Sequence, residues 1–322
     1  MSQTSTTPRA VLLGESLGLC RAEAIGPLAP GSATTFSIAG AESNVAIGLA
    51  RLGHRVAVAG RVGDDPVGQV VADTLRGEGV DLSGLVADPA APTAFMLRQR
   101  RTADRTVVTY FRTGSAGSRL THTDVPESLL HSAEVLHTTG ITLALSASAR
   151  DAAGHAIAAA RSAGTAVSLD VNHRDRLWSH QEARSALTPL LGQVDVLFGS
   201  EAELRLLTGR VDADAETLAA LLSEQGPEEV VVKRGAHGAL ARVGGKTFAV
   251  DAVPVTSVDP VGAGDAFVAG YLSARLDGQP PGERLRRGAL CGAFVVSVPG
   301  DWEGLPRRHE LPLLDSPQDV HR

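Results

Sequence analysis

Short apolar runs alternate with longer amphipathic stretches along most of the chain. Runs of four or five apolar residues bounded by turn residues are typical of buried strands, whereas apolar positions three or four residues apart predict helices. Strands are expected at 10–13, 56–59, 135–139, 166–170, 194–198 and 230–233, and helices near 40–53, 67–78, 146–163, 181–191, 201–207 and 282–298. This succession indicates an α/β fold with a mainly parallel central sheet and helices on both faces.

Two β-rich runs at 93–101 and 106–112 interrupt this rhythm, separated by a turn at 102–105. Together with an extended run at 34–38 they predict a small β-sheet lid, assembled from about 17–39 and 92–113. Alternation along a strand places Tyr110 and Arg112 on one face and Phe111 on the other. With no repeat or linker in the sequence, we expect one domain over 9–313, with tails at 1–8 and 314–322.

Polar residues and glycines follow each strand of the α/β region. The strand ends carry Gly140-Ile141, Asn172-His173-Arg174, Gly199-Ser200 and Lys233-Arg234-Gly235. Ligands of open α/β sheets bind beside the carboxyl ends of the strands. These segments are therefore expected to meet at one site.

The stretch Asp259-Pro260-Val261-Gly262-Ala263-Gly264-Asp265-Ala266-Phe267 predicts a glycine-rich turn that opens a helix. Proline and glycine argue against a helix up to Gly264, and the apolar stretch 266–276 predicts one after it. Gly262 and Gly264 let an anion approach the backbone amides at the helix start. Asp265 stands beside this anion site, where a carboxylate could take a proton from an attacking hydroxyl.

Composition narrows the classes of protein that the chain could be. A net charge of −6 argues against a nucleic-acid binder with a basic surface. Cys20 and Cys291 show no metal or disulfide spacing, which favours a reducing compartment. The first residues lack an export signal, and no apolar run approaches the length of a membrane span. We therefore expect a soluble, cytoplasmic protein without a membrane partner.

The nine-residue stretch resembles the second motif of the ribokinase-like (PfkB) carbohydrate kinases. The resemblance implies a ribokinase-like three-layer fold, an anion hole made by Gly262, Ala263 and Gly264, and Asp265 as catalytic base. The segment from Gly40 to Gly53 resembles the first motif, which implies that Gly40 and Asn44 contact the sugar. ATP and Mg²⁺ are the implied cofactors.

Two further segments have both a structural and a functional interpretation. Ser200 followed by Glu203 is a helix capping box, which is a sufficient explanation by itself. The same segment resembles the Asn-x-x-Glu motif of these kinases, with serine replacing asparagine, and implies that Glu203 organises Mg²⁺ through water. Residues 233–238 form an ordinary turn after a strand, and the resemblance implies that Lys233, Gly235 and Gly238 hold the nucleotide.

The strings 110–118, 140–142, 168–178 and 300–304 resemble those of 2-keto-3-deoxygluconate kinases, and the similarity covers roughly residues 10 to 310. It implies phosphorylation of the terminal hydroxyl of 2-keto-3-deoxygluconate by ATP. One departure is Met96, where these kinases often have tyrosine. The implied sugar-acid ligands are Gly40, Tyr110, Arg112, Ile141, Arg174, Asp265 and Asp301, and the nucleotide side would add Asn172, Arg174 and Ser200 to residues 233–238, Gly262 and Gly264.

The identity of the acceptor leaves alternatives open. Arg112 and Arg174 are candidates for a carboxylate clamp, because guanidinium matches a carboxylate in planar geometry. For either arginine taken alone, a surface ion pair is the more common explanation. The alternatives are a kinase for a neutral ketose or pentose such as fructose or ribose, and a sugar sensor that has lost catalysis. A lid sheet with an apolar face also suggests a homo-oligomer.

Overall fold

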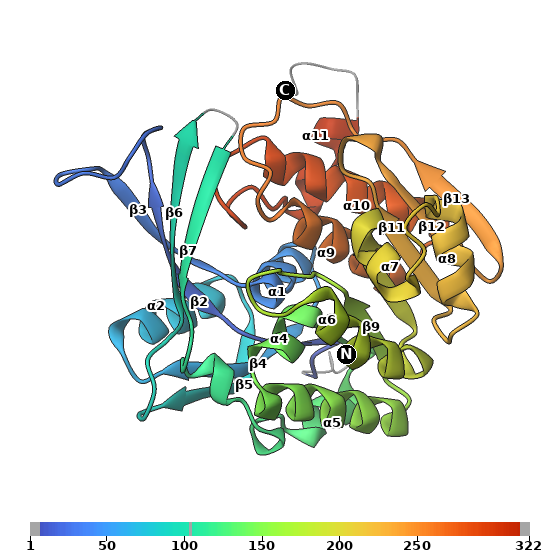
Figure 1. Cartoon of the computed structure of the whole chain (residues 1–322), viewed down its shortest axis with the longest axis horizontal. Coiled ribbons are helices and arrows are strands. Elements are labelled where there is room, and N and C mark those ends of the chain that lie inside the picture. The colour runs from blue at the N-terminus through green and yellow to red at the C-terminus, as the bar shows by residue number, and fades with distance from the viewer. Residues whose placement is uncertain (1–6, 103–104, 316–322) are drawn as a thin grey trace, which may run out of the picture.

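The computed structural model describes residues 7–102 and 105–315, so most of the predicted tails and two residues of the 102–105 turn lie outside the described residues. Its main sheet has nine strands in the order β13-β12-β11-β10-β9-β8-β1-β4-β5 (Figure 1). The strands of this sheet are β1 (Ala10–Leu13), β4 (Val56–Gly63), β5 (Asp81–Asp88), β8 (Val135–Thr139), β9 (Ala166–Asp170), β10 (Val196–Ser200), β11 (Glu229–Lys233), β12 (Ala239–Val243) and β13 (Lys246–Val250).

The first strand of the chain lies inside this sheet. β1 pairs in parallel with β4 on one side and β8 on the other, and its four residues are fully buried. All neighbours from β5 through to β11 are parallel, and β12 and β13 add an antiparallel hairpin at one edge. Strands covered on both faces need nearly continuous apolar sequence, which is what the short runs provide. The predicted mainly parallel sheet is confirmed.

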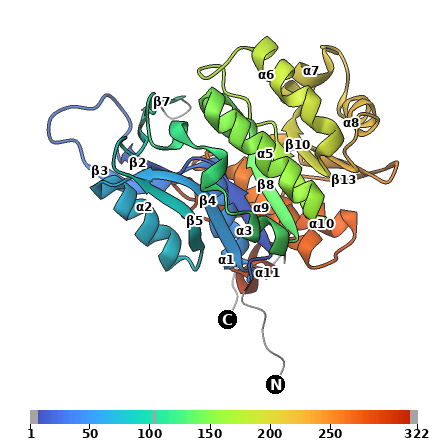
Figure 2. The same cartoon turned by 90° about the horizontal axis from the view of Figure 1, so that it is seen from below.

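Helices cover both faces of the main sheet, and each face has its own apolar core (Figure 2). One face packs against α5 to α8, and the other packs against α1, α2, α9 and α10. This is the three-layer arrangement that the sequence predicts. The helices are α1 (Ala41–Arg51), α2 (Pro66–Gly77), α3 (Glu127–Ser132), α4 (Gly140–Leu145), α5 (Ala147–Ala163), α6 (His180–Leu187), α7 (Glu201–Thr208), α8 (Ala215–Ser223), α9 (Ala263–Leu276), α10 (Pro281–Val296) and α11 (Pro312–Asp315). Within the described ranges no helix combines the length and the apolar content needed to span a bilayer.

A second, smaller sheet stands beside the main one (Figure 1). Its order is β3-β2-β6-β7, with β2 (Leu17–Ala22), β3 (Thr34–Ala39), β6 (Phe95–Thr102) and β7 (Arg105–Phe111). One face is apolar and buried, formed by Leu17, Leu19, Ala39, Ala94 and Met96. We call these four strands the lid sheet.

Candidate active site

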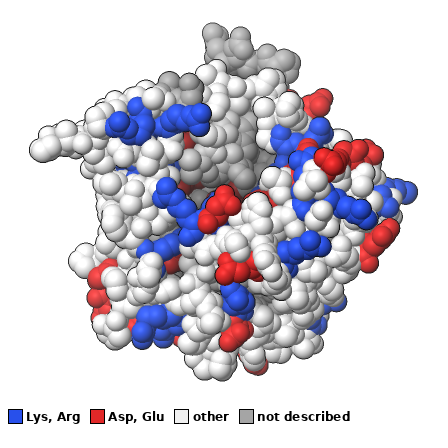
Figure 3. Space-filling model, viewed as in Figure 1, with Lys and Arg blue, Asp and Glu red and all other residues white. Residues whose placement is uncertain are grey.

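A cavity of about 90 Å³ lies between the lid sheet and the carboxyl ends of the main strands. All seven residues predicted to hold the substrate line it, together with Asp265, although they come from distant parts of the chain. Met96 also lines the cavity and pairs in register with Tyr110. Around the middle of this face of the molecule, positive and negative side chains lie close together (Figure 3). The lining residues are Leu17, Ala39, Gly40, Ala41, Asn44, Met96, Arg98, Val108, Tyr110, Arg112, Ile141, Arg174, Val261, Gly262, Asp265 and Asp301.

Asp265 is oriented by two amides from different parts of the chain. The Nδ2 of Asn44, in α1, donates to Oδ2 of Asp265 at 2.8 Å, and the Nδ2 of Asn172 lies 3.5 Å from Oδ1. Burial raises the pKa of Asp265 to about 6, although the bond from Asn44 opposes the shift. A carboxylate with a pKa near neutrality accepts a proton efficiently at physiological pH.

The glycine-rich turn places the start of α9 at the cavity. Gly262 is the N-cap with φ 80°, and a Cβ there would lie 1.9 Å from the backbone oxygen of Asp301, so only glycine fits. The helix begins at Ala263, so the prediction that Gly264 precedes the helix is wrong. The N–H of Gly264 belongs to the first turn, so it has no intrahelical partner and can donate to an anion. The first-turn amides and the positive helix end together suit a phosphate.

Lys233 closes the other side of this anion site. A Cβ at Gly264 would lie 3.6 Å from Nζ of Lys233, and Nζ donates to Oδ2 of Asp170 at 2.5 Å. Burial opposes the charge of Lys233, but the neighbouring carboxylates, Asp170 first, outweigh it and raise its pKa. Lys233 is therefore a fixed positive charge facing the glycines.

Of the residues predicted to bind the nucleotide, Arg174 and Gly262 line the sugar cavity, whereas Ser200, Gly235 and Gly238 lie outside it, next to Lys233. Ser200 is paired in register with Lys233, and Gly235 and Gly238 form the turn after β11. Gly238 has φ 78°, and a Cβ there would lie 2.0 Å from the backbone oxygen of Val250. The turn can therefore form only with glycine at 238, and Gly235 remains exposed beside it.

The capping box predicted at 200–203 is present. The backbone N–H of Ser200 donates to Oε2 of Glu203 at 2.6 Å, and that of His173 donates to Oε1 at 2.8 Å. Glu203 thus ties α7 to the loop after β9. Each carboxylate oxygen still has a lone pair that can accept a hydrogen bond from water.

The comparisons with known proteins agree with this geometry. The profile described as pfkB family carbohydrate kinase matches residues 12–308. The chain belongs to this family of carbohydrate kinases. The chain is 37% identical over 317 residues to the 2-dehydro-3-deoxygluconokinase of Bacillus subtilis, with 97% of each chain covered, and 37% identical to a fructokinase of Escherichia coli, with 84% of this chain and 90% of the other covered.

A solved structure of related fold contains the cofactors. A crystal structure described as a ribokinase II from Escherichia coli with ATP and Mg²⁺ aligns with a TM-score of 0.87 and 27% identity, covering 96% of this chain and 99% of the other. Kinases of the family use ATP as phosphoryl donor. In this PfkB kinase, the first-turn amides of α9 and the ammonium of Lys233 form a cradle whose charge and shape fit the phosphates.

Two of the three arginines in the sugar cavity of this PfkB kinase are already paired with carboxylates. Nε of Arg112 donates to Oε2 of Glu15 at 2.9 Å, and the guanidinium of Arg112 stacks over Tyr110. Arg98, from the lid strand β6, is almost fully buried and bonds to both Asp259 and Asp301. Arg98 and Glu15 were not predicted from the sequence, because only the fold brings Arg98 into the cavity and Glu15 against Arg112.

Arg174 differs from the other two arginines. Its guanidinium donates to the backbone oxygen of His173 at 3.1 Å, and it has no ion pair with a carboxylate of the described residues. It lies close enough to Asp265 to lower the pKa of that carboxyl. Among the described residues, Arg174 is therefore the arginine of the cavity whose guanidinium has no ion-pair partner and remains available to a substrate carboxylate.

A larger and more open hollow lies over α6, between Arg150 and Ser185. None of the residues predicted for catalysis or binding lines it. The chemistry is therefore assigned to the smaller cavity under the lid sheet.

Proposed function

We propose that this carbohydrate kinase transfers the γ-phosphoryl group of ATP to the terminal hydroxyl of 2-keto-3-deoxygluconate, giving 2-keto-3-deoxy-6-phosphogluconate. The observation that supports an acid substrate is the uncompensated charge of Arg174 in the sugar cavity. A sugar carboxylate would neutralise it in bidentate geometry. The substrate named for the Bacillus subtilis relative, 2-dehydro-3-deoxygluconate, is this same sugar acid.

Asp265 takes the proton of the acceptor hydroxyl as its oxygen attacks the γ-phosphorus. The bond from this phosphorus to the bridging oxygen of ATP breaks, and ADP leaves. The backbone amides of residues 262–264 and the ammonium of Lys233 stabilise the charge on the transferred phosphoryl group. Asn44 and Asn172 hold the carboxylate of Asp265 in place.

The remaining predicted residues surround these groups. Gly40, Tyr110, Ile141 and Asp301 line the sugar, with Arg112 held by Glu15 at its edge. Ser200, Gly235 and Gly238 border the nucleotide together with Asn172 and Arg174. Mg²⁺, which neutralises phosphate oxygens when bound, would be held through water by Glu203. We place the enzyme in the cytoplasm, where ATP is available.

An Arg174→Ala variant tests the acid preference. The wild type is expected to turn over 2-keto-3-deoxygluconate faster than fructose or ribose. The variant should lose about 10-fold to 100-fold in kcat/KM for the sugar acid, because it loses a charge-assisted bond of about 1.5–3 kcal/mol. Neutral sugars should lose less, because they lose only the effect of Arg174 on Asp265 and on the nucleotide. Coupled ADP release measures all three substrates, with the KM for ATP recorded alongside.

Arg176→Ala is the matched control, because Arg176 is exposed in the same loop and donates to the backbone oxygen of Val108. It should keep the acid preference. Equal losses on acid and neutral sugars in Arg174→Ala would overturn acid recognition. Fastest wild-type turnover on fructose would favour the neutral-ketose alternative.

We also propose that residues 9–313 act as one kinase domain whose lid sheet joins a second copy. Phe36, Phe95 and Phe111 form a row on the outer face of the lid sheet, with ring centroids 6.1 and 6.3 Å apart. Phe111 is 59% exposed and Phe36 is 48% exposed. Exposed apolar patches of this kind mark interaction surfaces.

A Phe111→Glu variant tests this interface. We expect light scattering during gel filtration to show a dimer for the wild type and a monomer for the variant, because a charge cannot be buried there without a partner. Val211→Glu is the control, since Val211 is 75% exposed in the loop before α8. A wild type that stays monomeric at micromolar concentration would contradict the proposal.

A further inference from the structure

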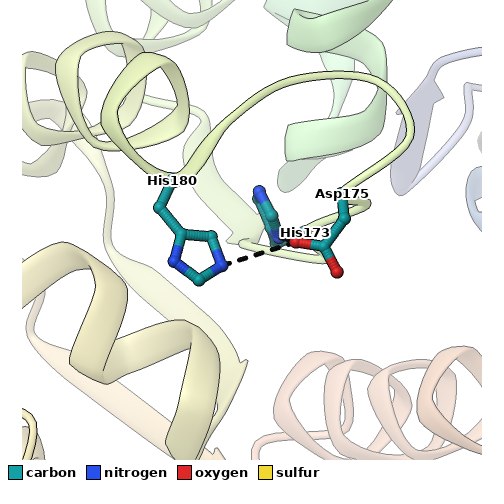
Figure 4. A group of neighbouring side chains, drawn as sticks. All are labelled: His173, Asp175 and His180. Carbon is teal, nitrogen blue, oxygen red and sulfur yellow. Dashed lines mark ion pairs between the residues drawn. The ribbon is translucent and has the colours of Figure 1, made fainter.

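Three potential metal ligands meet outside the phosphoryl-transfer site (Figure 4). His173 and Asp175 lie in the loop after β9, and His180 is the first residue of α6. Nδ1 of His173 lies 3.6 Å from Oδ1 of Asp175, and Nε2 of His180 lies 3.4 Å from the same oxygen. The three ligand atoms all lie within 4.8 Å of one another. The catalytic scheme above gives none of these three side chains a task.

The ring of His173 is held in place before any ligand binds. Its side chain is only 7% exposed, and it stacks nearly parallel on Trp178, with ring centroids 6.5 Å apart and an angle of 13°. Nε2 of His173 is buried without a partner among the described residues, whereas Nδ1 faces Asp175. The orientation of the ring therefore selects Nδ1 as the nitrogen available to a cation.

We propose that His173, Asp175 and His180 bind one divalent transition-metal ion of the Zn²⁺ or Ni²⁺ type. Bonds of about 2.0–2.2 Å in tetrahedral geometry place neighbouring ligand atoms about 3.3–3.5 Å apart, close to the two observed spacings. Two imidazoles and one carboxylate suit zinc and nickel rather than magnesium, which prefers oxygen ligands. The site is therefore chemically distinct from that of the magnesium of ATP.

The other two ligands can complete the site by small rotations. The side chains of Asp175 and His180 are 86% and 73% exposed, so nothing packs them into another position. Rotation of the His180 ring and of the Asp175 carboxylate can therefore bring all three ligand atoms to bonding distance of one ion, including the pair formed by His173 and His180. A second histidine pair, His122 and His155, has ring centroids 5.3 Å apart and Glu127 beside it, but it does not form such a set of three.

A bound ion would join the start of the loop to the start of α6. Arg174 and Arg176 lie between the ligands in the sequence, and both are exposed. The peptide bond that follows each of these arginines is therefore a target for trypsin. We expect the ion to slow cleavage after these arginines, because a protease needs a locally unfolded segment. This readout is independent of the sugar that the enzyme phosphorylates.

The binding experiment uses tag-free protein without nucleotide. Trp178 lies against His173, so Ni²⁺ in the site should quench its fluorescence, and a Trp302→Phe background removes the other tryptophan of the chain. We expect saturable quenching with one ion per chain. Calorimetry with Zn²⁺ should give the same stoichiometry, and Mg²⁺ at the same concentration should give no signal.

His180→Ala should weaken binding by more than about tenfold, because loss of an outer-shell partner alone costs about 10–100-fold. Trypsin protection should disappear with it. His155→Ala is the control and should bind like the wild type. No saturable binding, unchanged binding in His180→Ala, or binding without protection of the loop would each overturn the proposal. Both histidines are exposed, so neither substitution should lower the melting temperature.

Discussion

An Asp265→Asn variant is expected to lose about 10²- to 10⁴-fold in kcat, with the KM for both substrates nearly unchanged. The amide cannot accept the proton of the attacking hydroxyl, yet its oxygen can still accept the bond from Asn44. Ground-state binding is preserved while the transition state loses its base. Steady-state kinetics with 2-keto-3-deoxygluconate and ATP measure the loss.

The pH profile gives an independent check on Asp265. The carboxyl must be deprotonated to act as base, and burial has raised its pKa from 3.8 to about 6. Wild-type kcat/KM, which reports the pKa values of the free enzyme, should therefore be fully developed above pH 7 and fall as the pH decreases through 6. The residual activity of Asp265→Asn should not show this decrease at acidic pH. An asparagine variant as active as the wild type would remove Asp265 from the mechanism.

An Arg98→Met variant is expected to lose about 3–5 kcal/mol in the free energy of unfolding. Arg98 is 1% exposed and pairs with both Asp259 and Asp301, so methionine leaves two buried carboxylates without a cation. Burial already raises the pKa of Asp301 to about 7 despite Arg98. Urea unfolding at pH 8, above the pKa of Asp301, measures the loss.

The same substitution should also reduce activity in whatever protein remains folded. Asp259 accepts from the backbone N–H of Val261 at 3.2 Å and from that of Gly300 at 3.3 Å, so Arg98 steadies the turn that precedes α9. Arg76→Met is the control, because the pair of Arg76 with Asp73 is exposed and worth less than about 1 kcal/mol. Equal stability losses in the two variants would contradict the role of Arg98.

Local patterns predicted most of the α/β elements but not those whose sequence is ambiguous. The strands β1, β8 and β9 have the predicted bounds, because short apolar runs have few other ways to be buried. β5 and α8 were not predicted, and β2 was expected only as part of the lid segment 17–39, without strand bounds of its own. β2 lies in a stretch rich in glycine and proline, and its place in the lid sheet depends on pairing with β6, far along the chain.

One predicted helix is divided in two. The stretch 181–191 forms α6 up to Leu187 and then a 3₁₀ segment, Thr188–Gln193. Pro189 is responsible, since its ring removes an N–H and clashes with the preceding turn of an α-helix. The sequence contains this signal, but the periodicity of the apolar residues masks it.

The sequence predicted which residues line the cavity, but it did not predict which of the charged residues there form ion pairs with one another. Strand ends and glycine turns indicate which segments converge, and every predicted sugar ligand does line the cavity. The pairing of Arg112 with Glu15 links positions 97 residues apart, and that of Arg98 with Asp301 links positions 203 residues apart. Contacts between positions so far apart become visible only in the folded chain. Because they pair Arg112 and Arg98 with carboxylates, Arg174 is the arginine that is available to bind a substrate carboxylate.

The position of β1 has a consequence for shortened versions of the protein. β4 and β5 reach the other six strands of the main sheet only across these four amino-terminal residues. A protein whose translation started after Leu13 would lack β1. The backbone groups of β4 and β8 that pair with β1 would then have no hydrogen-bond partners. Such a fragment should aggregate rather than form a smaller enzyme.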